Sequence, residues 1–404
     1  MTISQILLFL TNIVFLISTS LLLIICAFFL IECVASRFAK VCNENIDNWQ
    51  NTQVNIIIPA HNEETVIGST VERLTPVLKP QDRLIVVADN CNDATAEIAR
   101  TKGATVIERY DSEKIGKGYA LDYGIKFIES KAPDVVVIID ADCTVYPDAI
   151  ARLTESAIAS QKPVQATYLM TTAKKSKSSK ELLAEFAYLM RNLVLPLGLK
   201  NLGQSCSLKG TGMAFPWHII SKANLANGHI VEDLKLGLDL AIAGHGAIFC
   251  PEARVTSYFP QQSQATKSQR TRWEHGHLQM IRTYLPLLLK EAVYQRRFDL
   301  IINALDLCVP PLSLLVVIWL GIMTISSLFT LVGASWIPVI ISATAGFFFL
   351  TAILTAWSGF ATEILPLNQL LTVPFYVLKK IPVYLQFLIK PQNIWIRTER
   401  DSVS

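Results

Sequence analysis

VVVIIDAD, residues 135–142, places five branched apolar residues directly before two aspartates. A short unbroken run of β-branched residues is typical of a strand that is buried on both faces of a parallel sheet. The expected strands are 54–58, 84–88, 105–107 and 135–139, and the expected helices between them are 63–78, 93–102 and 118–129. This alternation of strands and helices predicts an α/β fold with a Rossmann-like, mostly parallel sheet and right-handed crossovers.

Polar side chains follow three of these strands, at the edge where open α/β sheets bind their ligands. Pro59 and Glu63 follow the first strand and could line a nucleoside pocket, and Asp89 ends the second and could accept a hydrogen bond from a base N–H. Asp140 and Asp142 follow the fourth strand. Because Mg²⁺ typically takes one or two carboxylates plus phosphate oxygens, one of them could reach a metal and the other a ribose hydroxyl. Turn formation explains these aspartates about equally well.

Two further motifs carry single charged groups that suit a transfer reaction. Lys117 lies in GKG, residues 116–118, which lacks the GxxxxGK[ST] pattern of a P-loop but could offer one lysine to a diphosphate. Glu232 and Asp233 open an amphipathic stretch that predicts a helix. The helix dipole favours acidic residues at this position, so capping alone explains them. The functional alternative is that one carboxylate deprotonates an acceptor hydroxyl.

The segment QRTRW, residues 269–273, is the most specific motif in the chain. An arginine guanidinium matches diphosphate oxygens in a bidentate manner, and tryptophan offers a flat apolar face to a sugar ring. A basic helix beside the membrane is the alternative explanation. His275 and His277 follow two residues apart, so on a helix they face different directions and make a poor metal pair. We expect them to be structural or to contact an acceptor.

Three apolar segments indicate that the chain crosses a membrane. Only 17% of its 404 residues are charged, against about 25% in a typical soluble domain. The segments are Ile6–Ile31, Cys308–Val332 and Trp336–Trp357, each long enough for the ~20 residues that span hydrocarbon. Arg37 and Lys40 follow the first segment, so the positive-inside rule predicts an outer N-terminus and a cytoplasmic central region. A cleavable signal peptide fits poorly, because the run is too long and lacks a basic start.

These segments divide the chain into four expected parts. They are an N-terminal transmembrane helix in residues 1–40, an α/β domain in 50–290, a transmembrane hairpin in 300–358, and an interfacial amphipathic segment with a basic tail in 359–404. Prolines and two adjacent lysines in the last part favour a position at the membrane surface over a fourth span. The eight scattered cysteines form no CxxC pair and are expected to stay reduced. The net charge of +3 gives no indication of nucleic-acid binding.

Taken in order, the DxD, ED and QxxRW motifs resemble those of family 2 glycosyltransferases with a GT-A fold. The similarity is greatest to the membrane-integrated branch that includes cellulose, chitin and hyaluronan synthases, and it covers about residues 50–290. It implies an inverting, metal-dependent transfer of a hexose or N-acetylhexosamine from a UDP-sugar, with Mg²⁺ or Mn²⁺ as cofactor.

The resemblance also implies a role for each motif residue. Asp89 would contact the base, Lys117 the phosphates, Asp140 the ribose side and Asp142 the metal. Asp233 would be the general base. Gln269, Arg272 and Trp273 would close over the diphosphate and the acceptor sugar.

The expected acceptor is a growing cell-surface or exported polysaccharide. The enzyme would then be a multi-pass protein of the inner membrane that works with polysaccharide-export partners. Transfer of a single sugar to a membrane lipid is the alternative, because glucosyltransferases that act on ceramide resemble the same pattern. A non-catalytic synthase subunit is a minor alternative, since both the base and the metal carboxylate are present.

Overall fold

The computed structural model describes residues 3–38, 48–172, 177–260 and 262–370, together with Val377, Ile381, Pro382 and Tyr384. Its strands are β1 (Val54–Ala60), β2 (Arg83–Asp89), β3 (Thr105–Arg109), β4 (Val135–Ile138), β5 (Thr144–Val145), β6 (Val164–Thr171), β7 (Met213–Pro216) and β8 (Ile248–Tyr258). Its helices are α1 (Ile3–Ala35), α2 (Ile67–Leu74), α3 (Thr95–Thr101), α4 (Lys117–Ile128), α5 (Ala149–Ser160), α6 (Ser179–Leu189), α7 (Leu195–Asn201), α8 (Trp217–Ile220), α9 (Glu232–Ile242), α10 (Ser263–Gln295), α11 (Phe298–Cys308), α12 (Leu312–Leu331), α13 (Ile337–Phe360) and α14 (Leu367–Leu370), with a π-helical turn, η5 (Met190–Val194), between α6 and α7. Most of the expected interfacial segment, 359–404, lies outside the described residues.

The strands form one mixed sheet in the order β3-β2-β1-β4-β7-β6-β8-β5. Neighbours from β3 to β4 run parallel, as do β6 and β8. Strand β7 is antiparallel to both β4 and β6, and β5 is antiparallel to β8. The expected α/β fold with a mostly parallel sheet is therefore confirmed, but the four strands foreseen from the sequence make up only half of it.

The parallel register brings the polar strand ends to one edge of the sheet. Ala60 of β1 pairs with Ala88 of β2, and Ile57 pairs with Ile138 of β4. The residues that follow these strands therefore leave the sheet on the same side. Strand β4 ends at Ile138 and the chain then turns, with the Cys143 N–H donating to the Asp140 carbonyl at 3.2 Å, so Asp140 and Asp142 lie on this turn.

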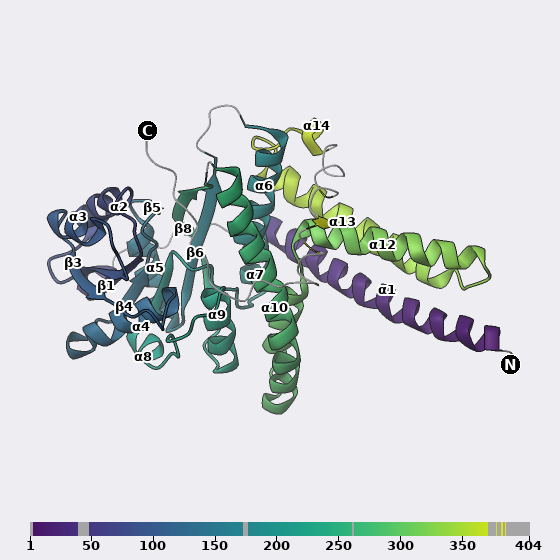
Figure 1. Ribbon diagram of the computed structural model, residues 1–404. Helices are drawn as coiled ribbons and strands as arrows, with labels where there is room; N and C mark the ends of the chain where they lie inside the picture. Colours follow the sequence, from purple (N-terminus) through teal and green to yellow (C-terminus); the bar gives the residue numbers. More distant parts are fainter. Residues whose placement is uncertain are drawn as a thin grey trace.

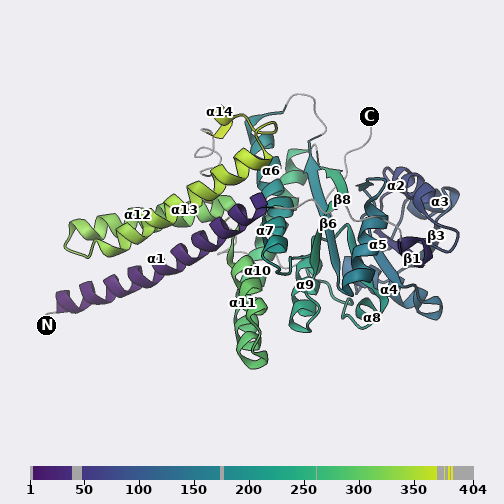
Figure 2. The same ribbon diagram turned by 180° about the vertical axis from the view of Figure 1, so that it is seen from behind.

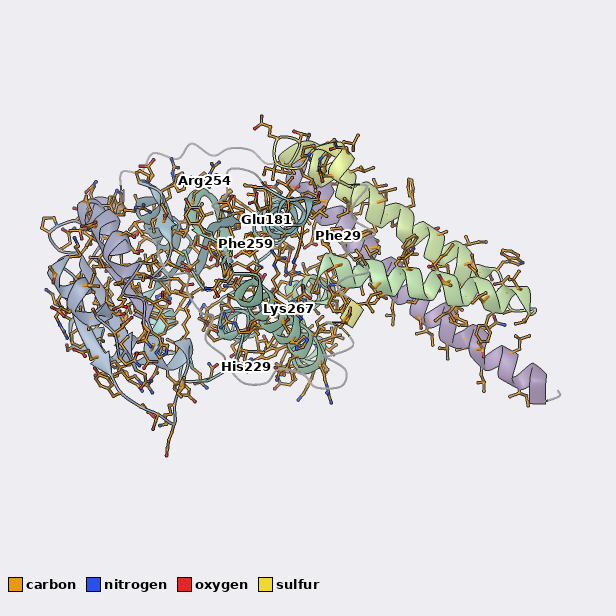
Figure 3. The ribbon with its side chains drawn as sticks, turned by 45° about the horizontal axis from the view of Figure 1, so that its top comes forward. Phe29, Glu181, His229, Arg254, Phe259 and Lys267 are labelled. Carbon is orange, nitrogen blue, oxygen red and sulfur yellow. The ribbon has the colours of Figure 1, made fainter. Side chains whose placement is uncertain are left out.

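Alternate residues of the central strands enter two separate hydrophobic cores. Ile57 and Ile138 pack with α4 in one core, whereas Ile56 and Ile58 pack with α2 and α5 in the other. The first core also contains Phe29 and Cys33 at the end of α1. The α/β domain is therefore anchored directly to the first membrane helix, and Figure 3 shows Phe29 where α1 reaches that domain.

Helices α1, α12 and α13 lie side by side and project away from the sheet, as both opposite views show (Figures 1 and 2). At the far end, the Ser335 N–H donates to the Asn12 side-chain oxygen at 3.0 Å, so the start of α1 and the α12–α13 turn lie together. Their outward faces are apolar, with Phe9, Leu328 and Phe347 all more than half exposed. A belt of this length and composition indicates a place in a membrane.

A fourth helix, 179–201, is also long and apolar enough to cross a membrane. It comprises α6, η5 and α7, and most of it is buried inside the protein. It contacts β6 on one side and α1 on the other. This helix therefore joins the sheet to the membrane helices and packs within the protein.

Candidate active site

A single cavity of about 1640 Å³ runs from the carboxyl edge of the sheet to α12 and α13. All ten site residues proposed from the sequence line it, namely Pro59, Glu63, Asp89, Lys117, Asp140, Asp142, Asp233, Gln269, Arg272 and Trp273. They come from segments more than 200 residues apart in the chain. This gathering of motifs from distant segments is difficult to attribute to strand-end turns or helix capping alone.

The ends of β1 and β2 are held together by hydrogen bonds across the cavity rim. His61 Nδ1 lies 2.7 Å from the carbonyl oxygen of Asp89. Asn62 and Asn90 have φ values of +55° and +51°, a left-handed conformation that asparagine tolerates better than most residues. Both strands can therefore turn sharply and leave Asp89 at the cavity wall.

Arg109, which the sequence reading missed, fixes the Asp89 carboxylate. Its Nη1 donates to Asp89 Oδ1 at 2.6 Å, and its Nη2 donates to Asp111 at 3.0 Å. Burial raises the pKa of Asp89 above its ordinary value, and the guanidinium of Arg109 opposes that effect. The pair holds one carboxylate oxygen in place and thereby sets the direction of the other.

The two aspartates after β4 form a candidate cation site. Ligand atoms of Asp140, Asp142 and Cys143 lie within 4.8 Å of one another. Hard divalent cations prefer carboxylate oxygen to sulfur, so the two aspartates are the suitable ligands. Lys117 forms an ion pair with Asp140 and donates to the Gly210 carbonyl at 2.8 Å. This arrangement fits a divalent ion and a phosphate group side by side.

Carboxylates surround Lys117 on several sides. Burial alone would lower the pKa of Lys117, but Asp140, Glu232 and Asp233 together raise it above its ordinary value. Its ammonium group therefore stays charged and can meet a phosphate. Burial and the adjacent Asp233 carboxylate also raise the pKa of Glu232.

Gly210 keeps the space between Asp233 and Lys117 open. It has a φ of +86°, and an added Cβ would lie 3.2 Å from Asp233 Oδ2 and 3.3 Å from Lys117 Nζ. We expect Gly210→Ala to lower turnover roughly tenfold, equivalent to about 1.4 kcal/mol, by displacing these two groups. Left-handed strain should also cost about 1 kcal/mol of folding stability. Turnover and thermal unfolding measure the two effects.

Gly203→Ala is the matched control for this prediction. Gly203 has a φ of +70°, but an added Cβ there would meet no atom within 4 Å. The two variants should lose similar stability, and only Gly210→Ala should lose activity. An equal loss of turnover in both would assign the effect to strain in the fold.

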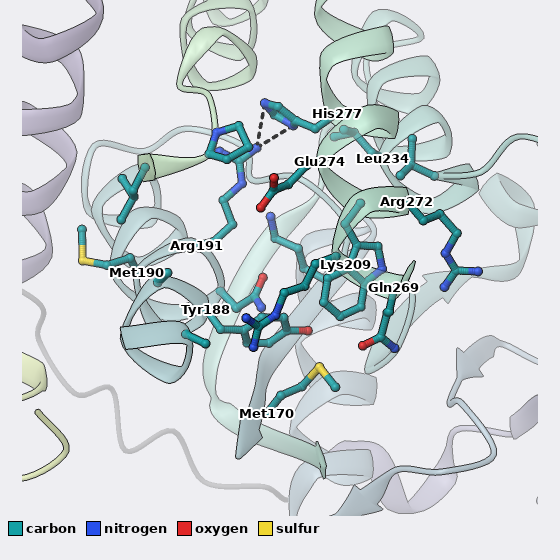
Figure 4. Close-up of a pocket in the computed structure, with 18 of the residues that line it drawn as sticks. Met170, Tyr188, Met190, Arg191, Lys209, Leu234, Gln269, Arg272, Glu274 and His277 are labelled. Atoms are coloured by element: carbon teal, nitrogen blue, oxygen red, sulfur yellow. Dashed lines mark hydrogen bonds between the residues drawn. The ribbon is translucent and has the colours of Figure 1, made fainter. Parts of the chain in front are cut away.

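The QRTRW motif lies on the first turns of α10, where it faces the cavity. Gln269, Arg272 and Trp273 are spaced i, i+3, i+4, so they share one face of the helix. The Trp273 ring packs against Tyr188 with a centroid separation of 5.9 Å. Gln269 is buried, and its Oε1 has no hydrogen-bond partner among the described residues. Figure 4 shows Gln269 and Arg272 at the cavity wall formed by α10.

One turn further along α10, the two histidines separate as expected. His277 lines the cavity and lies 3.0 Å from the Nη2 atom of Arg191 through its Nδ1. His275 is buried and does not line the cavity. Arg191 and Lys209 also line it, and sequence reasoning identified neither. The only local signal was a single arginine within the apolar stretch 182–199 and a lysine just before Gly210.

The comparison with protein families matches the region that forms this site. The family described as "Glycosyltransferase like family 2" matches residues 52–276, which is more than half of the chain. The protein therefore belongs to the family 2 glycosyltransferases, and it is a glycosyltransferase. This confirms the resemblance to family 2 glycosyltransferases that was inferred from the ordered motifs.

Individual relatives agree with this assignment. A "Probable glycosyltransferase YdaM" of Bacillus subtilis is 28% identical over 285 residues, covering 65% of this chain and 66% of the relative. A "4,4'-diaponeurosporenoate glycosyltransferase" of Staphylococcus haemolyticus is 30% identical over 205 residues, covering 46% of this chain and 50% of the relative. The chain thus spans about two thirds and one half of the lengths of these two curated relatives.

Among solved structures, the mannosyltransferase PcManGT from Pyrobaculum calidifontis, described in complex with GDP-Man and Mn²⁺, has a similar fold. The TM-score is 0.55 at 14% identity, and the match covers 94% of this chain and 99% of that one. The likeness extends beyond the sheet to nearly the whole described architecture. The expected GT-A fold with membrane helices is therefore confirmed.

Proposed function

We propose that this protein is an inverting, metal-dependent glycosyltransferase that moves a sugar from a UDP-sugar to a lipid-borne acceptor at the cytoplasmic face of the inner membrane. The observation that carries the proposal is the continuous cavity, which has charged groups at the sheet edge and apolar groups between the membrane helices. Residues 50–290 would form the catalytic domain, and α1, α12 and α13 its membrane anchor.

The donor would occupy the end of the cavity at the sheet. Asp89, oriented by Arg109, would accept a hydrogen bond from the base, and Pro59 and Glu63 would line the same pocket. Asp140 and Asp142 would hold Mg²⁺ or Mn²⁺, and the ion supplies positive charge for the diphosphate oxygens when bound. Lys117 and Arg272 would contact the diphosphate directly, and Gln269 and Trp273 would cover it.

The chain's own carboxylate would start the transfer. Asp233 would take the proton from an acceptor hydroxyl, whose oxygen then attacks the anomeric carbon from the face opposite the diphosphate. A bond forms between this oxygen and the anomeric carbon as the bond to the diphosphate oxygen breaks. The nucleoside diphosphate leaves with the bonding electrons, and the anomeric configuration inverts. Lys117 would stabilise the leaving group.

The other end of the cavity suits a hydrocarbon chain. Leu312, Val316 and Trp319 of α12 face the same space as Phe349 and Ile353 of α13. Burial of a ligand's apolar surface against these walls favours its binding by about 25 cal/mol per Å². They give no advantage to a free sugar. The lipid alternative therefore fits the cavity better than a soluble glycan, and a polysaccharide built on a lipid carrier remains the second candidate because of the QxxRW resemblance.

Product analysis tests the proposal directly. The purified full chain would receive a panel of UDP-sugars, plus GDP-mannose, with Mn²⁺ or Mg²⁺ and a total membrane lipid extract. The expected product is a lipid that has gained one hexose or N-acetylhexosamine from a UDP-sugar. A high-mass polymer made without lipid would overturn the lipid acceptor. Transfer from GDP-mannose alone would overturn the donor.

A further inference from the structure

Two cations stand in the cavity between the proposed reaction centre and the apolar channel. Arg191 projects from η5, and Lys209 lies next to Gly210, whose carbonyl contacts Lys117. Both side chains line the cavity with His277 (Figure 4). The proposed donor contacts do not use either residue.

The surroundings hold the Arg191 side chain in place without neutralising it. Its Nη1 donates to the Val309 carbonyl at 3.0 Å, where the chain passes from α11 to α12. Its Nη2 lies 3.0 Å from Nδ1 of His277. Because a guanidinium can only donate, that ring nitrogen accepts. Burial and the nearby cations Arg191 and Lys209 lower the pKa of His277 well below its ordinary value, so the ring is neutral.

Among the described residues, the ammonium of Lys209 likewise has a neutral hydrogen-bond partner. Its Nζ donates to Ser207 Oγ at 2.8 Å. Burial, followed by the like charge of Arg191, lowers the pKa of Lys209 to about 8, and the carboxylates of Asp306 and Asp233 oppose this effect. Two like charges within one largely apolar cavity are costly unless a counter-charge joins them.

The carboxylates in this region do not supply that counter-charge by direct pairing. Asp306 and Glu32 are buried in the adjoining α11 and α1. Across the described residues, no ion pair within 4.0 Å joins Asp306 or Glu32 to Arg191 or Lys209. The two cations are therefore available to an anion that enters the cavity.

We propose that Arg191 and Lys209 bind the phosphate of an amphiphilic acceptor, so that its hydrocarbon chain lies along α12 and α13 and its hydroxyl lies beside Asp233. The inference rests on the proposed function and narrows its acceptor to a phosphate-bearing lipid. Lys209 adjoins Gly210, which lies beside Asp233, and Arg191 is bonded to the Val309 carbonyl just before α12. This order of contacts matches the order in such a molecule: a reacting hydroxyl, then a phosphate ester, then an apolar tail. A neutral glycolipid would bring no anion within hydrogen-bond distance of either cation.

The experiment compares Arg191→Gln and Lys209→Gln with two surface controls, Arg282→Gln and Lys290→Gln, in the detergent-solubilised full chain. Arg282 and Lys290 are exposed on α10 and do not line the cavity. Binding is measured by thermal shift with phosphatidylglycerol, with a diacylglycerol of the same chains, and with inorganic phosphate. Transfer is measured with the same two lipids, and UDP binding is measured separately.

We expect the native chain to prefer phosphatidylglycerol, and each cavity variant to weaken that preference roughly 10- to 100-fold, as for the loss of one hydrogen bond to a charged group. UDP binding and both surface controls should be unchanged, and Arg191→Lys and Lys209→Arg should recover part of the affinity. A stabilising shift with inorganic phosphate alone, undiminished in both cavity variants, would overturn the assignment.

Two other outcomes separate the possible failures. Weakened UDP binding in the cavity variants, with unchanged lipid preference, would move Arg191 and Lys209 to the donor diphosphate and overturn this inference while leaving the proposed function intact. Equal use of diacylglycerol and phosphatidylglycerol by the native chain would overturn the phosphate subsite alone. Binding of UDP without transfer to, or binding of, either lipid would overturn the lipid acceptor itself.

Discussion

Asp233→Asn is expected to lower turnover by roughly 1,000-fold while UDP binding stays within a factor of two. The change removes the proton acceptor and keeps the shape of the side chain, so it removes the contribution of general base catalysis, about 10²- to 10⁴-fold. The Leu234 N–H donates to Asp233 Oδ1 at 2.8 Å, and the asparagine side-chain oxygen can accept the same hydrogen bond. Steady-state transfer and equilibrium UDP titration measure the two quantities.

The control for this prediction lies two turns further along the same helix. Asp239 is bonded to Tyr284 and Lys235 and does not line the cavity, so Asp239→Asn should keep near-native turnover. Glu232 is the rival base, because it adjoins Asp233 and also lines the cavity. Loss of turnover in Glu232→Gln, together with normal turnover in Asp233→Asn, would exchange the two roles.

Asp142→Ala is expected to abolish the stimulation of transfer by Mg²⁺ or Mn²⁺ and to lower turnover by about 1,000-fold at saturating metal. Loss of this ligand carboxylate should prevent the metal ion from binding. The positive charge that a bound ion supplies is worth several kcal/mol in such reactions. In the presence of metal, the variant should bind UDP only as tightly as the native chain does without metal. Isothermal titration with and without Mn²⁺ provides this comparison.

Asp148→Ala is the control, because Asp148 lies a few residues further on and its side chain is 69% exposed. It should keep the metal dependence of the native chain. If Asp142→Ala also keeps a normal metal response, the metal role would pass from Asp142 to another group. If turnover of the native chain does not change with EDTA, the metal-dependent part of the proposal fails.

The ordered motifs predicted much of the site because parallel strands place their carboxyl ends at one edge. Asp89, Asp140 and Lys117 could be grouped from the sequence for this reason, and the cavity contains all three. QRTRW was recognised by its chemistry, and its helical spacing turns Gln269, Arg272 and Trp273 to one side. Arg109 was not foreseen, although it follows the third expected strand, because its partner Asp89 is 20 residues away in the chain.

The second half of the sheet and the acceptor end of the cavity could not be predicted in this way. Strand β7 has only four residues, and its antiparallel position between β4 and β6 depends on pairing over long distances in the chain. The predicted hairpin part began at residue 300 and its first apolar segment at Cys308, whereas residues 298–308 form α11, which packs against α10. The hairpin itself begins at Leu312.

The sequence alone determined the kinds of element, the membrane segments and the residue types that suit sugar transfer, because apolar periodicity and motif order are local properties of the chain. Only the tertiary structure decided that the catalytic pocket opens into an apolar channel and that two cations stand between them. Arg191 contacts a histidine 86 residues further along the chain, and a cavity wall exists only after α1, α10, α12 and the sheet have packed together. Contacts between residues so far apart in the chain leave no periodic signal in the sequence. The identity of the acceptor depends on these contacts.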